Sequence, residues 1–226
     1  MTALISLSVP LEQHTWRYEE RQQQLELLHA DLAKCRLCVD AGYIPAACGN
    51  AAVRGYVGQP LMLVGQAPGH LSVARGFPFA GPGGRVLETW LQRAGYPAGA
   101  LRTHIYLSAL TKCYPGKSKP GDGDRKPSPA ELALCRPFLQ QELELVRPRA
   151  ILLVGGMASD AFLGSVGSGR LSEVVGRSFE RNGVKLLPLP HPSGVSRWLN
   201  QPEHQELLGA ALEILAGWRR SWERGD

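Results

Sequence analysis

The stretch from Leu61 to Ala94 limits the fold of this chain more than any other part of the sequence. Residues 61–64 (LMLV) form a short apolar run that ends at Gly65, which is the pattern of a buried strand. The turn Gln66-Ala-Pro-Gly69 follows the run. After the Gly-Pro-Gly-Gly segment at 81–84, apolar residues return at helical spacing. A strand, a glycine-rich turn and a helix in this order are typical of α/β proteins, which bind ligands beyond the carboxyl ends of their strands.

Three later apolar runs complete the expected sheet, at residues 105–110, 150–154 and 185–189. Strands that alternate with helices predict a single α/β domain with three αβα layers and a central four-stranded, mainly parallel sheet. The turns that follow the strands should then meet at one edge of the sheet, and we expect the functional site at that edge. These turns lie at Gly65, Cys113, Gly155 and His191.

Helix signals divide the 226-residue chain into two parts. Residues 1–34 are rich in Glu, Gln and Leu near their end, and we interpret them as an N-terminal helical extension that covers the domain. Residues 35–226 form the predicted α/β domain. Within it, Ser128-Pro-Ala-Glu131 predicts a helix start, because Ser is a preferred N-cap, Pro suits the first helical position and Glu stands three residues after the cap.

Five cysteines indicate a metal site. Cys35 and Cys38 form a CxxC pair, and Cys113 and Cys135 supply two further thiols. Four thiolates suit either tetrahedral zinc or an iron–sulfur cluster, and ligand softness does not choose between the two. Buried apolar cysteines are the alternative interpretation. We expect Cys48 not to be a ligand.

Charge and hydropathy restrict the partners and the location. A formal net charge of +5, with several basic residues in the Pro- and Gly-rich segment 114–127, suits a polyanion, although many basic proteins bind none. No apolar run is long enough to cross a membrane, and residues 1–9 carry no basic leader. An odd number of cysteines without a secretory signal favours a reducing compartment.

Six short motifs in a fixed order resemble the uracil-DNA glycosylase superfamily, especially its iron–sulfur branches, families 4 and 5. Each motif is weakly specific, whereas the ordered set, which extends from about residue 32 to 200, is highly specific. The motifs are CRLC at 35–38, GQAPG at 65–69, GFPFAGPGG at 76–84, KC at 112–113, CRPFL at 135–139 and HPS at 191–193.

The resemblance implies a cofactor and a base-binding site. It implies a 4Fe–4S cluster of structural role on Cys35, Cys38, Cys113 and Cys135. It also implies that Phe79 stacks on a base flipped out of DNA, and that His191 donates a hydrogen bond to the base carbonyl that gains charge as the base leaves. Gln66, Ala67 and Ala109 would border the same base. A core position for Phe79 and a structural role for His191 are the alternatives.

Four positions depart from the family patterns in ways that concern the site chemistry. Gln66 stands where family 4 has Glu, and Ala67 stands at the position of the water-activating Asp of family 1. Ala109 replaces the Asn that reads uracil, and Pro82 stands where family 5 carries Asp. No expected catalytic carboxylate is therefore present. We predict that Gln66 or His70 positions the water and that the substrate range extends to hypoxanthine or xanthine.

The segment that begins at His191 reads HPSGVSR and looks more like the NPSGLSR motif of the mismatch-specific glycosylases. By this likeness Val195 would fill the gap that the flipped base leaves. Ser196 and Arg197 would contact DNA phosphates, and Ser193 would also contact DNA.

The function predicted from these observations is a monofunctional DNA glycosylase of base excision repair. It would act as a monomer on DNA that contains deaminated bases, without a membrane, in the cytoplasm of a prokaryote at the nucleoid. A relative that binds damaged DNA or flipped bases without cleaving them is the first alternative. An iron–sulfur redox or zinc protein unrelated to DNA is the second, but it explains neither Phe79 nor His191.

Overall fold

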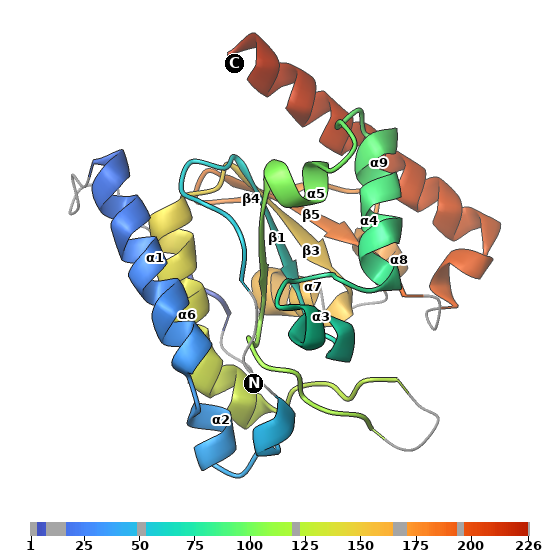
Figure 1. The fold of residues 1–226 in the computed structure, drawn as a ribbon. Coiled ribbons are helices and arrows are strands. Elements are labelled where there is room, and N and C mark those ends of the chain that lie inside the picture. Colours follow the sequence, from blue (N-terminus) through green and yellow to red (C-terminus); the bar gives the residue numbers. More distant parts are fainter. Residues whose placement is uncertain are drawn as a thin grey trace.

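A computed structural model describes residues 4–7, 17–48, 53–118, 123–164, 171–193 and 197–225. Its centre is a five-stranded sheet with the order β2-β1-β3-β5-β4, in which only β4 runs antiparallel to its neighbour (Figure 1). The α/β class and the four predicted strands are confirmed. The strands are β1 (Leu61–Gly65), β2 (Ile105–Ala109), β3 (Ala150–Val154), β4 (Phe179–Arg181) and β5 (Val184–Leu189).

The prediction of four strands was one too few. The additional strand, β4, pairs with β5 through a turn at Asn182 and Gly183, whose φ angles are 51° and 76°. Positive φ at both central residues matches the Asn-Gly signal of a tight hairpin. The sequence does not mark β4 as a strand, because its three residues are only partly buried and form no apolar run.

Helices cover both faces of the sheet and form the predicted three layers (Figure 1). One face packs against α4, α5 and α9, and the other packs against α1, α6 and α7, because side chains of a strand alternate between faces. The helices are α1 (Tyr18–Lys34), α2 (Leu37–Asp40), α3 (His70–Arg75), α4 (Pro82–Arg93), α5 (Ala100–Thr103), α6 (Pro129–Val146), α7 (Gly156–Leu163), α8 (Leu171–Val174) and α9 (Pro202–Arg224), with 3-10 turns η1 (Ala46–Cys48) and η3 (Trp198–Asn200).

Local signals explain where α6 begins. The Ser128 hydroxyl accepts a hydrogen bond from the Glu131 backbone N–H, and the Glu131 carboxylate accepts one from the Ser128 backbone N–H. This is the reciprocal cap that the sequence predicted. The helix continues through Pro137 and ends at Val146.

Helix α1 lies beside α6 on the same face of the sheet (Figure 1). Leu25, Leu28 and Leu32 are buried in the core on this face, together with Met62 and Val64 of β1. The boundary at residue 34 stays a prediction. These leucines nevertheless make α1 part of the same hydrophobic core as the strands and α6. No helix in the described ranges is both long and apolar enough to span a membrane.

Candidate functional site

A cavity of about 790 Å³ opens at the carboxyl edge of the sheet. Its walls come from the turns after β1, β2, β3 and β5 and from the N-terminal ends of α4 and α7. Helix N-termini present unpaired backbone N–H groups, which favour negative charge. The structure brings together seven residues that the sequence predicted to be functional. They are Gln66, Ala67, His70, Phe79, Ala109, His191 and Ser193.

Phe79 is held in place by the glycines around it. Its backbone has φ = 54°, which lies in the left-handed region that bulky residues rarely adopt. Its ring covers Gly65, because a Cβ atom on residue 65 would lie 3.0 Å from the ring atom Cζ. A Cβ atom on residue 84 would overlap the Phe79 carbonyl oxygen, so only glycine fits there. Strained backbone of this kind is concentrated at functional sites.

His191 follows β5 and has a defined tautomer. The backbone N–H of Ser193 donates to His191 Nδ1 at 3.3 Å, and the Ser193 hydroxyl lies 2.9 Å from the same nitrogen. Since Nδ1 accepts, the proton of the neutral ring is on Nε2. Gly155 has φ = 87° and allows the ring to approach, with a Cβ position 3.6 Å from His191 Cδ2.

The charge of His191 is set by its surroundings. Loss of water around the ring lowers its pKa below the ordinary value of 6.5, and the Asp124 carboxylate partly opposes this effect. The imidazole is therefore neutral at pH 7 and acts as a hydrogen-bond donor through Nε2.

The turns after β1 and β2 are joined by backbone hydrogen bonds. The Leu110 N–H donates to the Gly65 carbonyl at 2.9 Å, and the Thr111 N–H donates to the Gln66 carbonyl at 3.3 Å. These bonds hold Gln66 and Ala67 beside Ala109 at the edge of the cavity. The methyl group of Ala109 offers a ligand no hydrogen bond.

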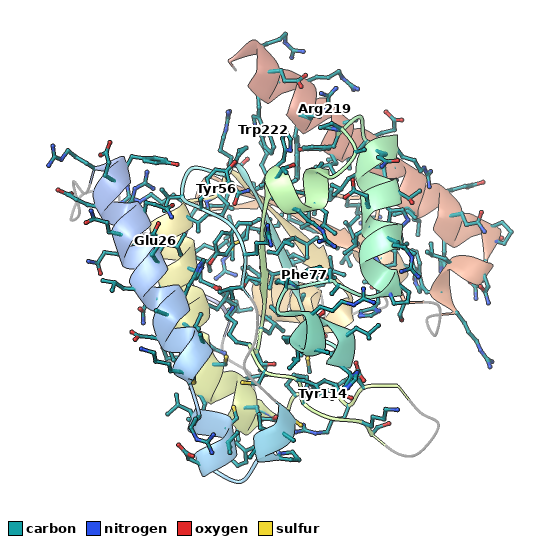
Figure 2. The ribbon with its side chains drawn as sticks, in the orientation of Figure 1. Glu26, Tyr56, Phe77, Tyr114, Arg219 and Trp222 are labelled. Atoms are coloured by element: carbon teal, nitrogen blue, oxygen red, sulfur yellow. The ribbon has the colours of Figure 1, made fainter. Side chains whose placement is uncertain are left out.

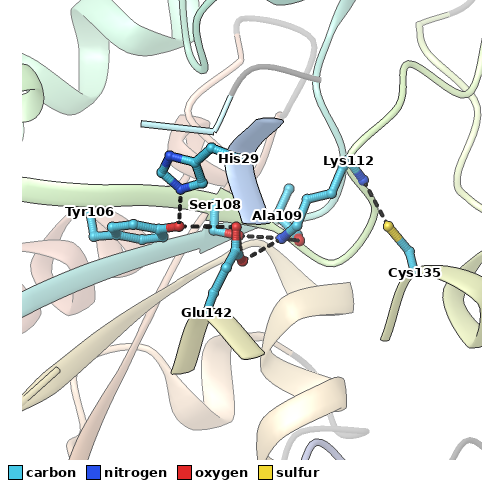
Figure 3. Close-up of polar contacts among 7 residues, drawn as sticks. All are labelled: His29, Tyr106, Ser108, Ala109, Lys112, Cys135 and Glu142. Carbon is cyan, nitrogen blue, oxygen red and sulfur yellow. Dashed lines mark hydrogen bonds and ion pairs between the residues drawn. The ribbon is translucent and has the colours of Figure 1, made fainter. Parts of the chain in front are cut away.

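A buried polar network lies behind Ala109 and was missed by the sequence analysis (Figure 3). Glu142 of α6 accepts hydrogen bonds from Lys112 Nζ at 2.6 Å, Ser108 Oγ at 2.6 Å and Tyr106 Oη at 3.2 Å. His29 Nε2 is 2.8 Å from Tyr106 Oη. Since Tyr106 donates to Glu142, its oxygen accepts from His29. The side chains of Lys112 and Glu142 are 3% and 0% exposed, so this is a desolvated ion pair.

This network connects the cavity to a thiol. Lys112 Nζ donates to the Ala109 carbonyl at 2.8 Å, and the Lys112 backbone N–H donates to Cys135 Sγ at 3.2 Å (Figure 3). A charged residue on the buried face of α6, between Leu139 and Val146, was the available sequence signal. Its partners, on β2 and in the turn that follows β2, could not be identified without the tertiary structure.

Two carboxylates also line the cavity, Asp124 and Asp160. Neither stands at a motif position, since Asp124 lies in the Pro- and Gly-rich segment 114–127 and Asp160 lies in α7. Tyr114 Oη donates to Asp124 Oδ1 at 2.9 Å. Burial raises the pKa of Asp160, and the charge of Lys126 partly lowers it.

The four predicted ligand thiols lie in one region. Burial, together with the charges that Cys135, Cys38 and Cys35 would carry, raises the pKa of Cys113 to about 12. Burial likewise raises the pKa of Cys135 to about 11, against the lowering effect of Lys112. All five cysteines are free of disulfides. In the described ranges no three His, Cys, Asp or Glu side chains are grouped closely enough for a single metal ion.

The remaining predicted DNA contacts are only partly described. Ser193 lines the cavity and is fixed to His191. Arg197 is exposed and immediately precedes η3. Val195 and Ser196 lie outside the described residues.

Comparisons with known proteins cover most of the chain. The model of a family described as the uracil DNA glycosylase superfamily matches residues 54–216. The type-4 uracil-DNA glycosylase of Archaeoglobus fulgidus is 28% identical over 194 residues, which are 81% of this chain and 87% of the relative. The type-4 protein of Thermotoga maritima is 26% identical over 181 residues, or 78% and 85% of the two chains. A type-5 uracil-DNA glycosylase of Pyrobaculum aerophilum is 32% identical over 89 residues, or 39% and 36%.

Proposed function

This chain belongs to the uracil DNA glycosylase superfamily, and on that premise we propose that it is a monofunctional DNA glycosylase of base excision repair that removes uracil from DNA. One observation carries the proposal. Phe79 and His191 line the same cavity at the strand ends, in a chain whose similarity to type-4 glycosylases extends over most of its length.

The proposed reaction requires the base to leave the DNA stack. Enzymes that act on a base flip it into a pocket and hold it against an aromatic surface. Phe79 supplies that surface, since Gly65 and Gly84 fix its ring and backbone. Cleavage then leaves a negative charge on the base, and His191 Nε2–H donates to the carbonyl oxygen on which this charge develops. The N-termini of α4 and α7 add positive potential at the same cavity.

The proposed specificity follows from Ala109. A methyl group at this position cannot pair with the uracil edge as an amide would, so selectivity rests on Gln66, Ala67 and the backbone around them. We propose that hypoxanthine and xanthine are further substrates for this reason.

We propose that the DNA strand is contacted by four residues after β5, with Val195 in the gap that the flipped base leaves in the stack. They are Ser193, Val195, Ser196 and Arg197. A monomer that acts in the cytoplasm on the prokaryotic nucleoid stays a prediction.

The alternative proposal is a protein that binds flipped bases without cleaving them. It is favoured by Gln66, Ala67 and Pro82, which leave the motif positions without a carboxylate. The experiment that separates the two proposals uses oligonucleotides with one uracil, hypoxanthine or xanthine, in single and double strands. Formation of abasic sites supports the enzyme. Tight binding of these oligonucleotides without cleavage of any base supports the non-catalytic protein.

We also propose that Cys35, Cys38, Cys113 and Cys135 hold a 4Fe–4S cluster, as the resemblance implies. The chemistry of these thiols fits such a cluster. The pKa values of Cys113 and Cys135 are raised, so both thiols would become thiolates together only next to a strong positive charge, which bound iron supplies. The Lys112 N–H bond to Cys135 Sγ is the kind of contact that tunes such a cluster. Its role would be structural: it would tie α2, α6 and the turn after β2 to one another.

Replacement of Cys135 by serine is expected to remove the iron. Wild-type protein purified without oxygen should be brown and contain about four iron atoms per chain, whereas Cys135→Ser should be colourless. Cys48→Ser is the matched control and should keep its iron. Elemental analysis and the visible spectrum provide the measurement. Zinc in the wild-type protein, or equal loss of iron in Cys48→Ser, would contradict this assignment.

Replacement of Gly84 by alanine is expected to disturb the Phe79 surface. The added methyl group overlaps the Phe79 carbonyl oxygen, so the residue must move. We expect the rate of uracil release at saturating enzyme to fall about 100-fold, as for other displacements of a positioning group by about 1 Å. Gly209→Ala on α9 is the matched control, because its Cβ atom would meet nothing within 4 Å and Gly209 lies outside the cavity. Equal rates for the two variants would refute the role of Gly84.

A further inference from the structure

The proposed reaction requires a negative group that the motif positions do not supply. As the bond from the sugar carbon C1′ to the base breaks, the sugar gains positive charge. The attacking water must then give up a proton. Neutral residues stand at all the positions where the related families carry a carboxylate, which are Gln66, Ala67 and Pro82. A carboxylate elsewhere in the same cavity would meet this need, an inference that rests on the proposed function.

Asp124 brings a carboxylate to that cavity from a different part of the chain. Its Oδ2 lies 3.2 Å from the point that a Cβ atom on residue 69 would occupy, so Gly69 leaves room for it beside the turn after β1. Its Oδ1 accepts the 2.9 Å hydrogen bond from Tyr114 Oη. Figure 2 shows Tyr114 at the start of the long loop that leaves β2. The carboxylate is thus fixed on one oxygen and faces the glycine-rich turn with the other.

The described parts of the loop hold Asp124 in this position. Residue 124 pairs with Lys117 in an isolated antiparallel bridge, and the next N–H, that of Arg125, donates to the Gly116 carbonyl at 2.9 Å. The Arg125 guanidinium then binds both carboxylate oxygens of Glu131 at 2.8 Å. Glu131 is the buried capping residue of α6, so a two-bond ion pair ties the loop to the core. A group positioned in advance costs little reorganisation during the reaction.

The charges around the cavity favour Asp124 over the second carboxylate. Asp124 acts electrostatically on the His191 ring, which is the proposed donor to the leaving base. Asp160 instead interacts with the Lys126 ammonium, which offsets its negative charge. Asp124 is exposed, and in the described part of the chain the one side-chain hydrogen bond that it accepts comes from the neutral phenol of Tyr114.

We propose that Asp124 is the catalytic carboxylate of this protein and replaces the acidic residue that the glycine-rich turn lacks. The C1′–N bond breaks, and its electron pair goes to the base, which His191 stabilises through a hydrogen bond. The negative charge of Asp124 stabilises the cationic sugar. A water oxygen forms the new C1′–O bond, and the proton that it releases passes to the Asp124 carboxylate and then to solvent.

The test is the single-turnover rate of uracil release by Asp124→Asn, measured with iron-loaded, full-length protein. Positioned acid–base groups contribute roughly 100- to 10,000-fold, and we expect a rate loss in that range. The dissociation constant for uracil-containing DNA should not rise, because the change removes a negative charge. Sodium azide should restore part of the rate of Asp124→Ala, since an anion that attacks C1′ directly needs no base. The product is then a sugar azide, identified by its mass.

Asp31→Asn is the matched control for Asp124→Asn, because it is the same chemical change at an exposed position on α1 outside the cavity. It should keep the wild-type rate. The proposal is overturned if Asp124→Asn also keeps that rate, if its loss lies entirely in DNA binding, or if Asp160→Asn alone abolishes cleavage. If the wild-type protein cleaves no base, the proposed function fails instead, and the two failures are therefore distinct.

Discussion

Uracil release by His191→Ala is expected to be roughly 100- to 1,000-fold slower than release by the wild-type protein, which is the usual loss when one donor to a developing oxyanion is removed. The reason is the Nε2 proton. Ser193 occupies Nδ1 by hydrogen bonds and so leaves Nε2–H as the donor of the neutral ring. The measurement is the single-turnover rate at saturating enzyme. DNA binding should change little, because the bond strengthens only as the base gains charge.

His104→Ala is the control for this variant, because His104 is exposed and lies outside the cavity. It should cleave at the wild-type rate. A His191→Ala protein that keeps the wild-type rate but binds DNA weakly would show that the ring contributes only to DNA binding.

The pH dependence of the reaction follows from the same histidine. Desolvation lowers the pKa of His191 below 6.5, so its neutral form persists to lower pH than that of an ordinary histidine. The rate of uracil release should thus be constant near pH 7 and fall only as the pH decreases through the lowered pKa. Protonation puts a hydrogen on Nδ1 and breaks the contact from the Ser193 N–H. If the pH is lowered and the rate begins to fall while the pH is still above 7, this description of the ring is contradicted.

Glu142→Gln is expected to destabilise the protein by about 3–5 kcal/mol, the usual cost of leaving one member of a buried ion pair without its partner. Lys112 would lack its carboxylate partner in a site where its side chain is 3% exposed. Its other described acceptors are the neutral Ser108 hydroxyl and the Ala109 carbonyl. The measurement is the free energy of unfolding in urea, with iron-loaded protein throughout. Because the network ends at Ala109 and at Cys135, a ligand of the proposed cluster, this variant should also lose iron faster during unfolding if the proposed cluster is bound.

Glu144→Gln provides the control on the same helix, since Glu144 is exposed and faces solvent. It should change the free energy of unfolding by less than about 0.5 kcal/mol. The double variant Lys112→Met, Glu142→Leu removes both charges and should recover most of the stability. Equal stability of Glu142→Gln and Glu144→Gln would mean that the ion pair contributes nothing.

The sequence alone predicted the features that depend on nearby residues. The apolar runs marked four strands, since a strand buried on both faces is apolar throughout. The Ser128 and Glu131 signal located the start of α6, because a helix cap involves only residues within one turn. The glycine-rich turns predicted the edge at which Phe79 and His191 meet, because parallel strands end at the same side of a sheet. The cysteine ligands and the DNA contacts stay predictions.

The tertiary structure decided the features that depend on contacts between distant segments. Strand β4 forms only because β5 offers it a partner, and its own three residues carry no apolar signal. Glu142 and Lys112 are 30 residues apart, and their burial becomes acceptable only when α6 packs on β2. From the sequence, Asp124 is an ordinary loop residue. In the folded protein its position at the cavity depends on Tyr114, on the space beside Gly69 and on the Arg125–Glu131 ion pair. A local pattern determines which element a segment forms, whereas the partner of a buried charge is known only once the chain has folded.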